Sequence, residues 1–168
     1  MSIASIRRLL HLAEQLCAIR TMIISGQNNQ SVELKVAGYQ FPDEKSDEWD
    51  ANWLRIYLNV KADIGHWQTI DPSLTTWEFQ SLVDWFRNLI EDVQIDSLRI
   101  SFTEPNLAFK LLSSTESTRK VRIEFDLESR PQSVSREDEC FVDLVLEHQE
   151  VLKVSEDLAA ELQKFPER

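Results

Sequence analysis

The chain has 168 residues and a formal net charge of −11, from 29 Asp and Glu against 18 Lys and Arg. This length suits one domain with a core of its own, and the acidic balance argues against direct binding of nucleic acid or of an anionic membrane. The same charge fits a surface that only keeps the protein soluble, or one that attracts a basic protein. The two cysteines, Cys17 and Cys140, lie far apart and in no ligand spacing. We therefore expect neither a disulfide framework nor a structural zinc site, and we expect a reducing cytoplasm as the location.

The first 21 residues differ from the rest in charge and pattern. No stretch there or elsewhere reaches the ~20 continuous apolar residues of a membrane span. Apolar side chains at helical spacing, with arginines between them, predict a basic amphipathic helix and not an export signal. Two interpretations stay open: residues 1–21 form an N-terminal helix, or they are an extension upstream of a natural start at Met22. Residues 22–168 are expected to form a single domain.

Alternating apolar and polar residues predict strands through the first half of the chain. These strands cover residues 22–25, 32–41, 53–61 and 66–70, with a hairpin turn at 63–65. Pro42 ends the second of them, because proline removes a backbone donor. A polar loop follows with five carboxylates against one lysine, the carboxylates being those of Asp43, Glu44, Asp47, Glu48 and Asp50.

Residues 74–93 form the clearest predicted helix. Apolar residues recur there at the i, i+3, i+4 spacing of a buried helical stripe. Thr75 and Glu78 are spaced as a capping box at its start. We expect this helix to lie across one face of the sheet.

The second half repeats the alternation. Strands are expected at residues 98–102, 107–111, 121–131 and 140–147, and a closing helix at 149–165 before Pro166. The stretch 121–131 alternates apolar and charged side chains throughout, which is typical of an antiparallel strand with one dry and one wet face. The expected fold is therefore α+β: a mainly antiparallel sheet of about seven strands in meander order, with two helices packed on one face. We find no internal sequence repeat.

The strongest candidate for acid–base chemistry is the wet face of that strand. Glu124, Asp126 and Glu128 are expected to share it, and paired carboxylates do such work when burial separates their pKa values. Arg122 and Arg130 are expected on the same face, which favours ionised, ion-paired carboxylates and argues against catalysis.

Other chemistries find less support in the sequence. His11, His66 and His148 are isolated, with no partner at metal-ligand spacing. Three glycines are too few for a phosphate-binding loop, and no nucleophile-elbow pattern frames a serine. We expect no catalytic residues, no metal and no cofactor.

Five tryptophans are many for a chain of this size. They either fill the core and its edge, or some of them anchor a protein interface. Trp49 lies within the acidic loop and Trp85 lies off the main helical stripe. A large aromatic side chain ringed by charge is the usual composition of an interface hot spot, so Trp49 is the candidate anchor and Trp53 the second candidate.

Several motifs in order resemble a known family. They are GYQFP at 38–42, DANWL at 50–54, TIDPSLTTW at 69–77, SFTEPNL at 101–107 and FDLESRP at 125–131. Together they resemble the WapI family of bacterial immunity proteins, from about residue 22 to residue 166. The resemblance implies a small cytoplasmic protein encoded beside a secreted, wall-associated or contact-dependent toxin. Such a protein binds the C-terminal domain of the toxin, in the type case a nuclease acting on tRNA, and has no catalytic residues.

An acidic surface suits that partner, because a nuclease is basic where it holds phosphates. The expected partner-binding residues lie in the acidic loop, on the alternating strand and in a second acidic loop. They are Asp43, Glu44, Asp47, Glu48, Trp49, Asp50, Glu124, Asp126, Glu128, Glu137, Asp138 and Glu139. The alternative for each is a solvated side chain without a partner.

Two other hypotheses stay open. A binding module for a different protein, including a second copy of the chain, predicts no toxin gene as neighbour. A small-molecule-binding or hydrolytic domain predicts a deep pocket with convergent polar groups.

Overall fold

The computed structural model describes residues 22–26, 29–91 and 98–168. The helix expected over the first 21 residues lies outside this range, and so does the predicted end of the long helix at residue 93. Within it the chain forms two four-stranded antiparallel sheets and not one sheet of about seven strands. The first sheet contains β1 (Met22–Ser25), β2 (Ser31–Tyr39), β3 (Trp53–Ala62) and β4 (Gly65–Thr75). The second contains β5 (Arg99–Ser101), β6 (Leu107–Ser114), β7 (Thr118–Phe125) and β8 (Phe141–Glu147).

The single-sheet prediction is wrong because β4 and β5, the strands on either side of the predicted helix, do not pair, so a second sheet begins at β5. This helix, α3 (Thr76–Ile90), has the predicted capping box: Thr75 accepts the backbone N–H of Glu78, and the Glu78 carboxylate accepts the N–H of Thr75. The closing helix, α4 (His148–Leu162), ends before Pro166. A third helix, α2 (Glu48–Asn52), lies within the loop predicted to have no regular structure. Five residues are too few for a helical period to stand out.

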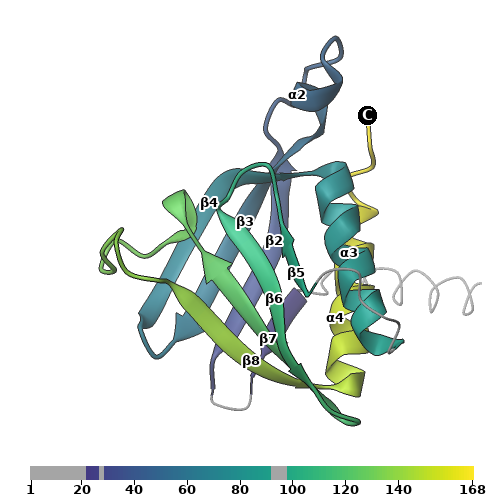
Figure 1. The fold of residues 1–168 in the computed structure, drawn as a ribbon. Helices are drawn as coiled ribbons and strands as arrows, with labels where there is room; N and C mark the ends of the chain where they lie inside the picture. The colour runs from purple at the N-terminus through teal and green to yellow at the C-terminus, as the bar shows by residue number, and fades with distance from the viewer. Residues whose placement is uncertain (1–21, 27–28, 92–97) are drawn as a thin grey trace, which may run out of the picture.

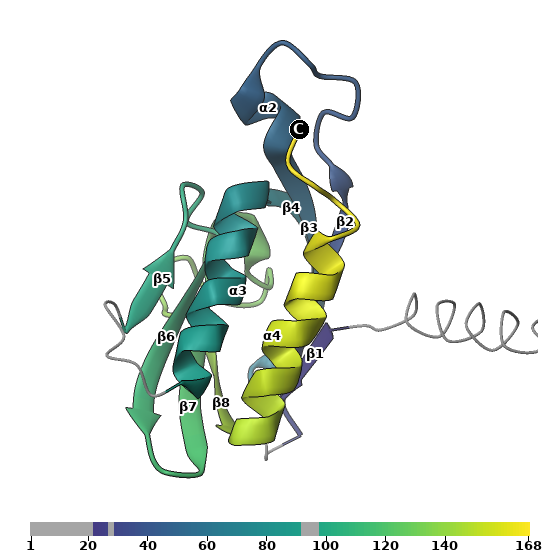
Figure 2. The same cartoon turned by 90° about the vertical axis from the view of Figure 1, so that its right-hand side faces the viewer.

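The order of elements repeats although no sequence repeat is detectable. Each half is a four-stranded meander followed by a helix. The helices are exchanged between the halves: α3 packs on β6, where the rings of Phe86 and Phe109 are 5.9 Å apart, and α4 packs on β1 and β2. Glu161 of α4 accepts the backbone N–H of Val36, at the bulge of β2, at 3.0 Å. Figure 2 shows the helices side by side, with α3 over the second sheet and α4 over the first.

One continuous core joins both sheets and both helices. Trp85, although off the main stripe, is 6% exposed and contacts the rings of Phe86 and Phe109. Trp67 is also buried and donates its indole N–H to Ser129 O at 2.9 Å. Core filling therefore accounts for these two tryptophans. Because each helix also packs against the sheet of the other half, the two halves share one core.

The stretch 121–131 is a strand only as far as Phe125. The Asp126 side chain accepts the N–H of Leu127 and starts a 3-10 turn, η1 (Leu127–Ser129). Leu127, predicted on the dry face, has φ +46° and is 50% exposed, whereas Arg130, predicted on the wet face, has a side chain only 9% exposed. The prediction that Glu124, Asp126 and Glu128 share a strand face is therefore wrong. The alternation continues in the sequence, but the cap at Asp126 turns the backbone away from the sheet.

Candidate partner-binding surfaces

Residues 41–52 project from the strands between β2 and β3 and carry six of the predicted residues; we call them the acidic tip (Figure 1). Two of its carboxylates organise the backbone. Asp47 Oδ1 accepts the N–H groups of Trp49 at 2.9 Å and of Asp50 at 3.0 Å, which caps α2. Glu44 Oε1 accepts the Ser46 hydroxyl and the N–H groups of the next three residues. The Ser46 hydroxyl, with these backbone donors, lowers the pKa of Glu44 to about 2.

The acidic tip is also tied to the C-terminal residues. The guanidinium of Arg168 donates to the carbonyls of Phe41 at 2.9 Å, Pro42 at 2.7 Å and Ala51 at 2.7 Å. The buried Asn52 side chain donates to Arg168 O and accepts Arg168 N–H. These bonds join two segments more than a hundred residues apart, so the tip has a defined shape and is not a loose loop.

The remaining carboxylates of the acidic tip face solvent. In the part of the chain that the structure describes, no hydrogen bond or ion pair engages the side chains of Asp43, Glu48 or Asp50. Trp49 lies among them, 55% exposed. The structure therefore brings together the predicted tip residues, but it divides them into two that hold the fold and four that are displayed.

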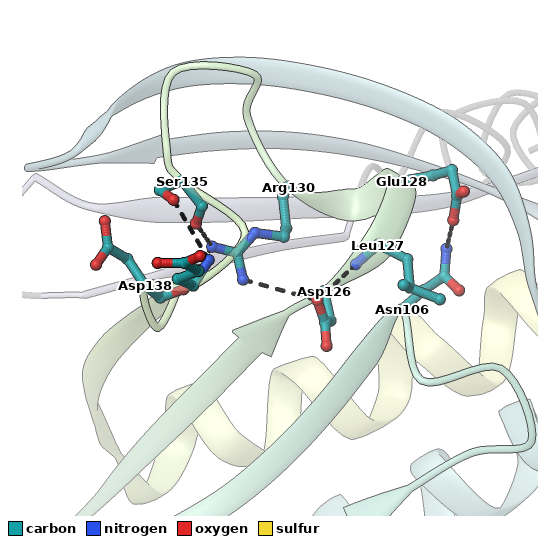
Figure 3. Close-up of polar contacts among 8 residues, drawn as sticks. Asn106, Asp126, Leu127, Glu128, Arg130, Ser135 and Asp138 are labelled. Carbon is teal, nitrogen blue, oxygen red and sulfur yellow. Dashed lines mark hydrogen bonds and ion pairs between the residues drawn. The ribbon is translucent and has the colours of Figure 1, made fainter.

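Residues 126–140 connect β7 to β8 and carry the other acidic stretch; we call them the acidic connection (Figure 1). Figure 3 shows Arg130 at its centre, with Nη2 donating to the carbonyls of Ser135 and Asp138, both at 2.5 Å. Its Nη1 lies 3.6 Å from Asp126 Oδ1. Arg130 thus determines the path of the acidic connection, as Arg168 does for the tip. The sequence did not predict that Arg130 and Arg168 hold these loops. The backbone carbonyls they bind are brought to them by the fold, and no residue pattern indicates such a contact.

An open hollow of about 460 Å³ lies between the acidic connection and the outer face of the second sheet. It brings together five of the predicted carboxylates with as many cationic side chains. Its charged lining consists of Glu124, Asp126, Glu137, Asp138 and Glu139 with Arg99, Lys110, Arg122, Arg130 and Arg136. Glu124 is ion-paired as expected, but with Arg99 of β5 at 2.8 Å, whereas Arg122, one of the two arginines expected on this face, pairs with Asp143. The hollow is consequently balanced in charge.

Glu128 lies apart from that hollow. Asn106 Nδ2 donates to Glu128 Oε2 at 3.4 Å and to Asp71 Oδ2 at 3.2 Å, which joins the 3-10 turn to β4. Burial, and then the negative charge of Glu128, raise the pKa of Asp71 above its ordinary value. Glu128 therefore belongs to the contact between the sheets and not to the surface around Glu124.

The described residues contain no group of three or more His, Cys, Asp or Glu side chains placed to hold a metal ion. Every helix among them is too short or too polar to cross a membrane.

The fold and its surfaces thus define an acidic α+β protein of two meander-and-helix units with exchanged helices. The family model of the immunity protein WapI-like family matches residues 22–166, so the chain belongs to that family. No curated protein and no solved structure matches the chain. Membership of an immunity protein family indicates toxin neutralisation with a toxin protein as partner, and such proteins are typically non-catalytic.

Proposed function

We propose that this protein acts in the cytoplasm, where it binds the C-terminal domain of a cognate bacterial toxin, a nuclease, and neutralises it by covering its basic surface. The observation that carries the proposal is the family match over residues 22–166. A nuclease is basic where it holds phosphates, so an acidic protein is steered to that surface and excludes the nucleic acid from it.

The acidic tip is the first contact surface in this proposal. Its displayed side chains, those of Asp43, Glu48, Trp49 and Asp50, combine free negative charge with an exposed aromatic ring. The bonds from Arg168 and Asp47 fix the tip before a partner arrives. A surface that is already ordered loses less conformational entropy on binding, which favours affinity.

The acidic connection is the second contact surface. Glu137, Asp138 and Glu139 are exposed there, while Glu124 and Asp126 already have cationic neighbours. We assign it a smaller part in attracting the toxin, because its carboxylates share the hollow with arginines. Glu44, Asp47 and Glu128 act as structural residues in this proposal and not as contacts.

The test mixes the full chain with the toxin C-terminal domain encoded immediately upstream, at low and at high salt, and measures both binding and cleavage of tRNA. The expected result is a stoichiometric complex, loss of cleavage, and weaker binding as salt is raised. Absence of binding at low salt, or continued cleavage by the complex, would overturn the proposed function. Binding that does not depend on salt would overturn the mechanism of covering a basic surface. If no toxin domain is encoded there, the protein is an acidic binding module with another partner.

A further inference from the structure

Trp49 is the only exposed one of the five tryptophans, all of which lie in the described residues. Its exposure is built by α2: Ala51 and Asn52 occupy the buried side of this helix, at 3% and 0% exposure, and so leave Trp49 on the outer side. The cap from Asp47 and the bonds from Arg168 hold this orientation. A large apolar side chain held in solvent by a well-bonded segment marks a contact surface more strongly than one on a loose loop.

Trp49 does not stand alone. Its ring meets that of Trp77 edge-on, with centroids 5.0 Å apart and an interplanar angle of 89°. Phe41, at the base of the acidic tip, is 42% exposed. The aromatic surface therefore extends from α2 to the first turn of α3.

Trp77 also lines an open hollow of about 420 Å³ that lies between α3 and the end of α4. Ala159, Leu162 and Pro166 form its apolar lining, and Gln80, Gln163 and one residue of each charge, Arg87 and Glu167, form its polar lining. Figure 1 shows α2 and the C-terminal residues at the same end of the molecule as the start of α3. Trp77 thus joins two features, the displayed ring of Trp49 and the hollow between the helices, into one surface.

The charge around the rings selects the occupant. Asp43, Glu48 and Asp50 are on the same short segment as Trp49, and within the described residues their side chains make no hydrogen bond or ion pair. An apolar partner would leave these carboxylates facing apolar surface, whereas a lysine or arginine satisfies the carboxylates and the ring faces together. The aliphatic stem of such a side chain packs on an indole while its cationic end reaches a carboxylate.

We propose that Trp49 and Trp77, with the free carboxylates of Asp43, Glu48 and Asp50, bind a lysine or arginine of the toxin domain, and that an adjoining apolar residue of the same toxin segment enters the hollow beside α4. This inference rests on the proposed function and adds to it the side-chain chemistry of the contact.

The test compares dissociation constants of the full chain and its variants with the toxin domain. Trp49→Ala is expected to weaken binding roughly 30-fold, which is the loss typical of an interface hot spot. Trp49→Phe keeps a ring face and is expected to recover part of that loss. Ile70→Ala is the matched control, because Ile70 is 53% exposed on β4, away from the tip, and it is expected to change binding less than about twofold. Circular dichroism and thermal melting check that each variant is folded.

A double-mutant cycle then identifies the cation. Each lysine and arginine on the toxin domain is replaced by alanine, and its effect is measured with Trp49 present and with Trp49→Ala. One cationic residue is expected to lose most of its effect when Trp49 is absent. Ala159→Lys, which adds a second cationic side chain to the hollow beside Arg87, is expected to weaken binding at least fivefold.

The outcomes separate the two proposals. If the unaltered protein fails to bind the toxin domain, the proposed function is overturned and this contact with it. If it binds and inhibits normally while Trp49→Ala binds equally well, only the contact proposed here is overturned. A dimer of the protein alone that Trp49→Ala dissociates would make the surface a self-association interface, and would also overturn this contact.

Discussion

The acidic tip and the acidic connection are built in the same way and differ in what they display. Each is a loop whose path is determined by one arginine that donates to backbone carbonyls, Arg168 for the tip and Arg130 for the connection. Arg168 joins the tip from more than a hundred residues away, whereas Arg130 reaches carbonyls five and eight residues along the chain. The Arg130 side chain is 9% exposed and lies among the acids of its own loop.

The acidic tip and the acidic connection differ more in their unpaired charge than their numbers of acidic residues suggest. The acidic connection shares its hollow with as many cationic side chains as carboxylates. The acidic tip has five carboxylates with Lys45 and Arg168 as the nearby cations, and it adds an exposed tryptophan. The net charge of the whole chain therefore does not tell where unpaired negative charge lies; the pairing of each carboxylate does.

The largest effect on stability is expected from Arg130→Ala. This change removes two charge-assisted hydrogen bonds and leaves the carbonyls of Ser135 and Asp138 without their donor. The free energy of unfolding is expected to fall by about 2–3 kcal/mol, measured by urea denaturation. Arg136→Ala, in the same loop but exposed, is the control, and a change within about 0.5 kcal/mol is expected for it. Equal losses in the two variants would contradict the role given to Arg130.

The difference in displayed charge is tested by two matched triple variants. One combines Asp43→Asn, Glu48→Gln and Asp50→Asn, and the other combines Glu137→Gln, Asp138→Asn and Glu139→Gln. Each removes three negative charges, so a difference between them reports position and not net charge. The tip variant is expected to lower the association rate with the toxin domain about tenfold at low salt, and the connection variant about two- to threefold. The association rates are measured by stopped flow over a series of salt concentrations. An equal or larger loss of rate in the connection variant would contradict the larger role given to the acidic tip.

A smaller loss of stability is expected from Arg168→Ala. Its guanidinium makes more bonds than that of Arg130 but lies in a solvent-exposed residue, where water replaces lost partners at little cost. We expect the free energy of unfolding to fall by about 1 kcal/mol and the amides of α2 to exchange faster with solvent hydrogen. Glu167→Ala, next to it and exposed, should change neither. A loss larger than that of Arg130→Ala would show that the tip is the more strongly coupled of the two loops.

The smallest effect is a pH dependence confined to the acidic tip. The pKa of Glu44 lies at about 2 in the folded protein, below its ordinary 4.5, so its ionised form is favoured by folding. Its contribution is therefore fully present above pH 4.5 and is lost as the pH falls toward 2. A titration of the Glu44 side chain by nuclear magnetic resonance should give this low pKa, and Glu44→Gln should remove the corresponding change in α2 amide exchange. A midpoint near 4.5 would contradict the bonds assigned to Glu44.

Local patterns in the sequence determined the parts of the fold that local contacts make. The hairpin of β3 and β4 and the capping box of α3 involve residues within a few positions of one another, and both were predicted. Alternation also located β7, but it continued past Phe125 because a cap at a single residue, Asp126, interrupts no pattern. The family could be recognised from several short motifs in a fixed order, because such motifs are read from the sequence without knowledge of the fold.

Only the tertiary structure decided how the two halves share a core and which acidic residues remain free. The sequence of α3 does not indicate that it packs on β6 and not on the first sheet, because its apolar stripe could cover either sheet. Asp43 and Asp47 look alike in the sequence, yet one is displayed and the other caps a helix. Arg130 and Arg168 hold their loops in place only because folding brings backbone carbonyls within reach of their guanidinium groups. For Arg168 these carbonyls are distant in the sequence, and for Arg130 they lie beyond a turn of the same loop. Such contacts are non-local, and a sequence pattern records which residues prefer burial or charge but not which partner they meet.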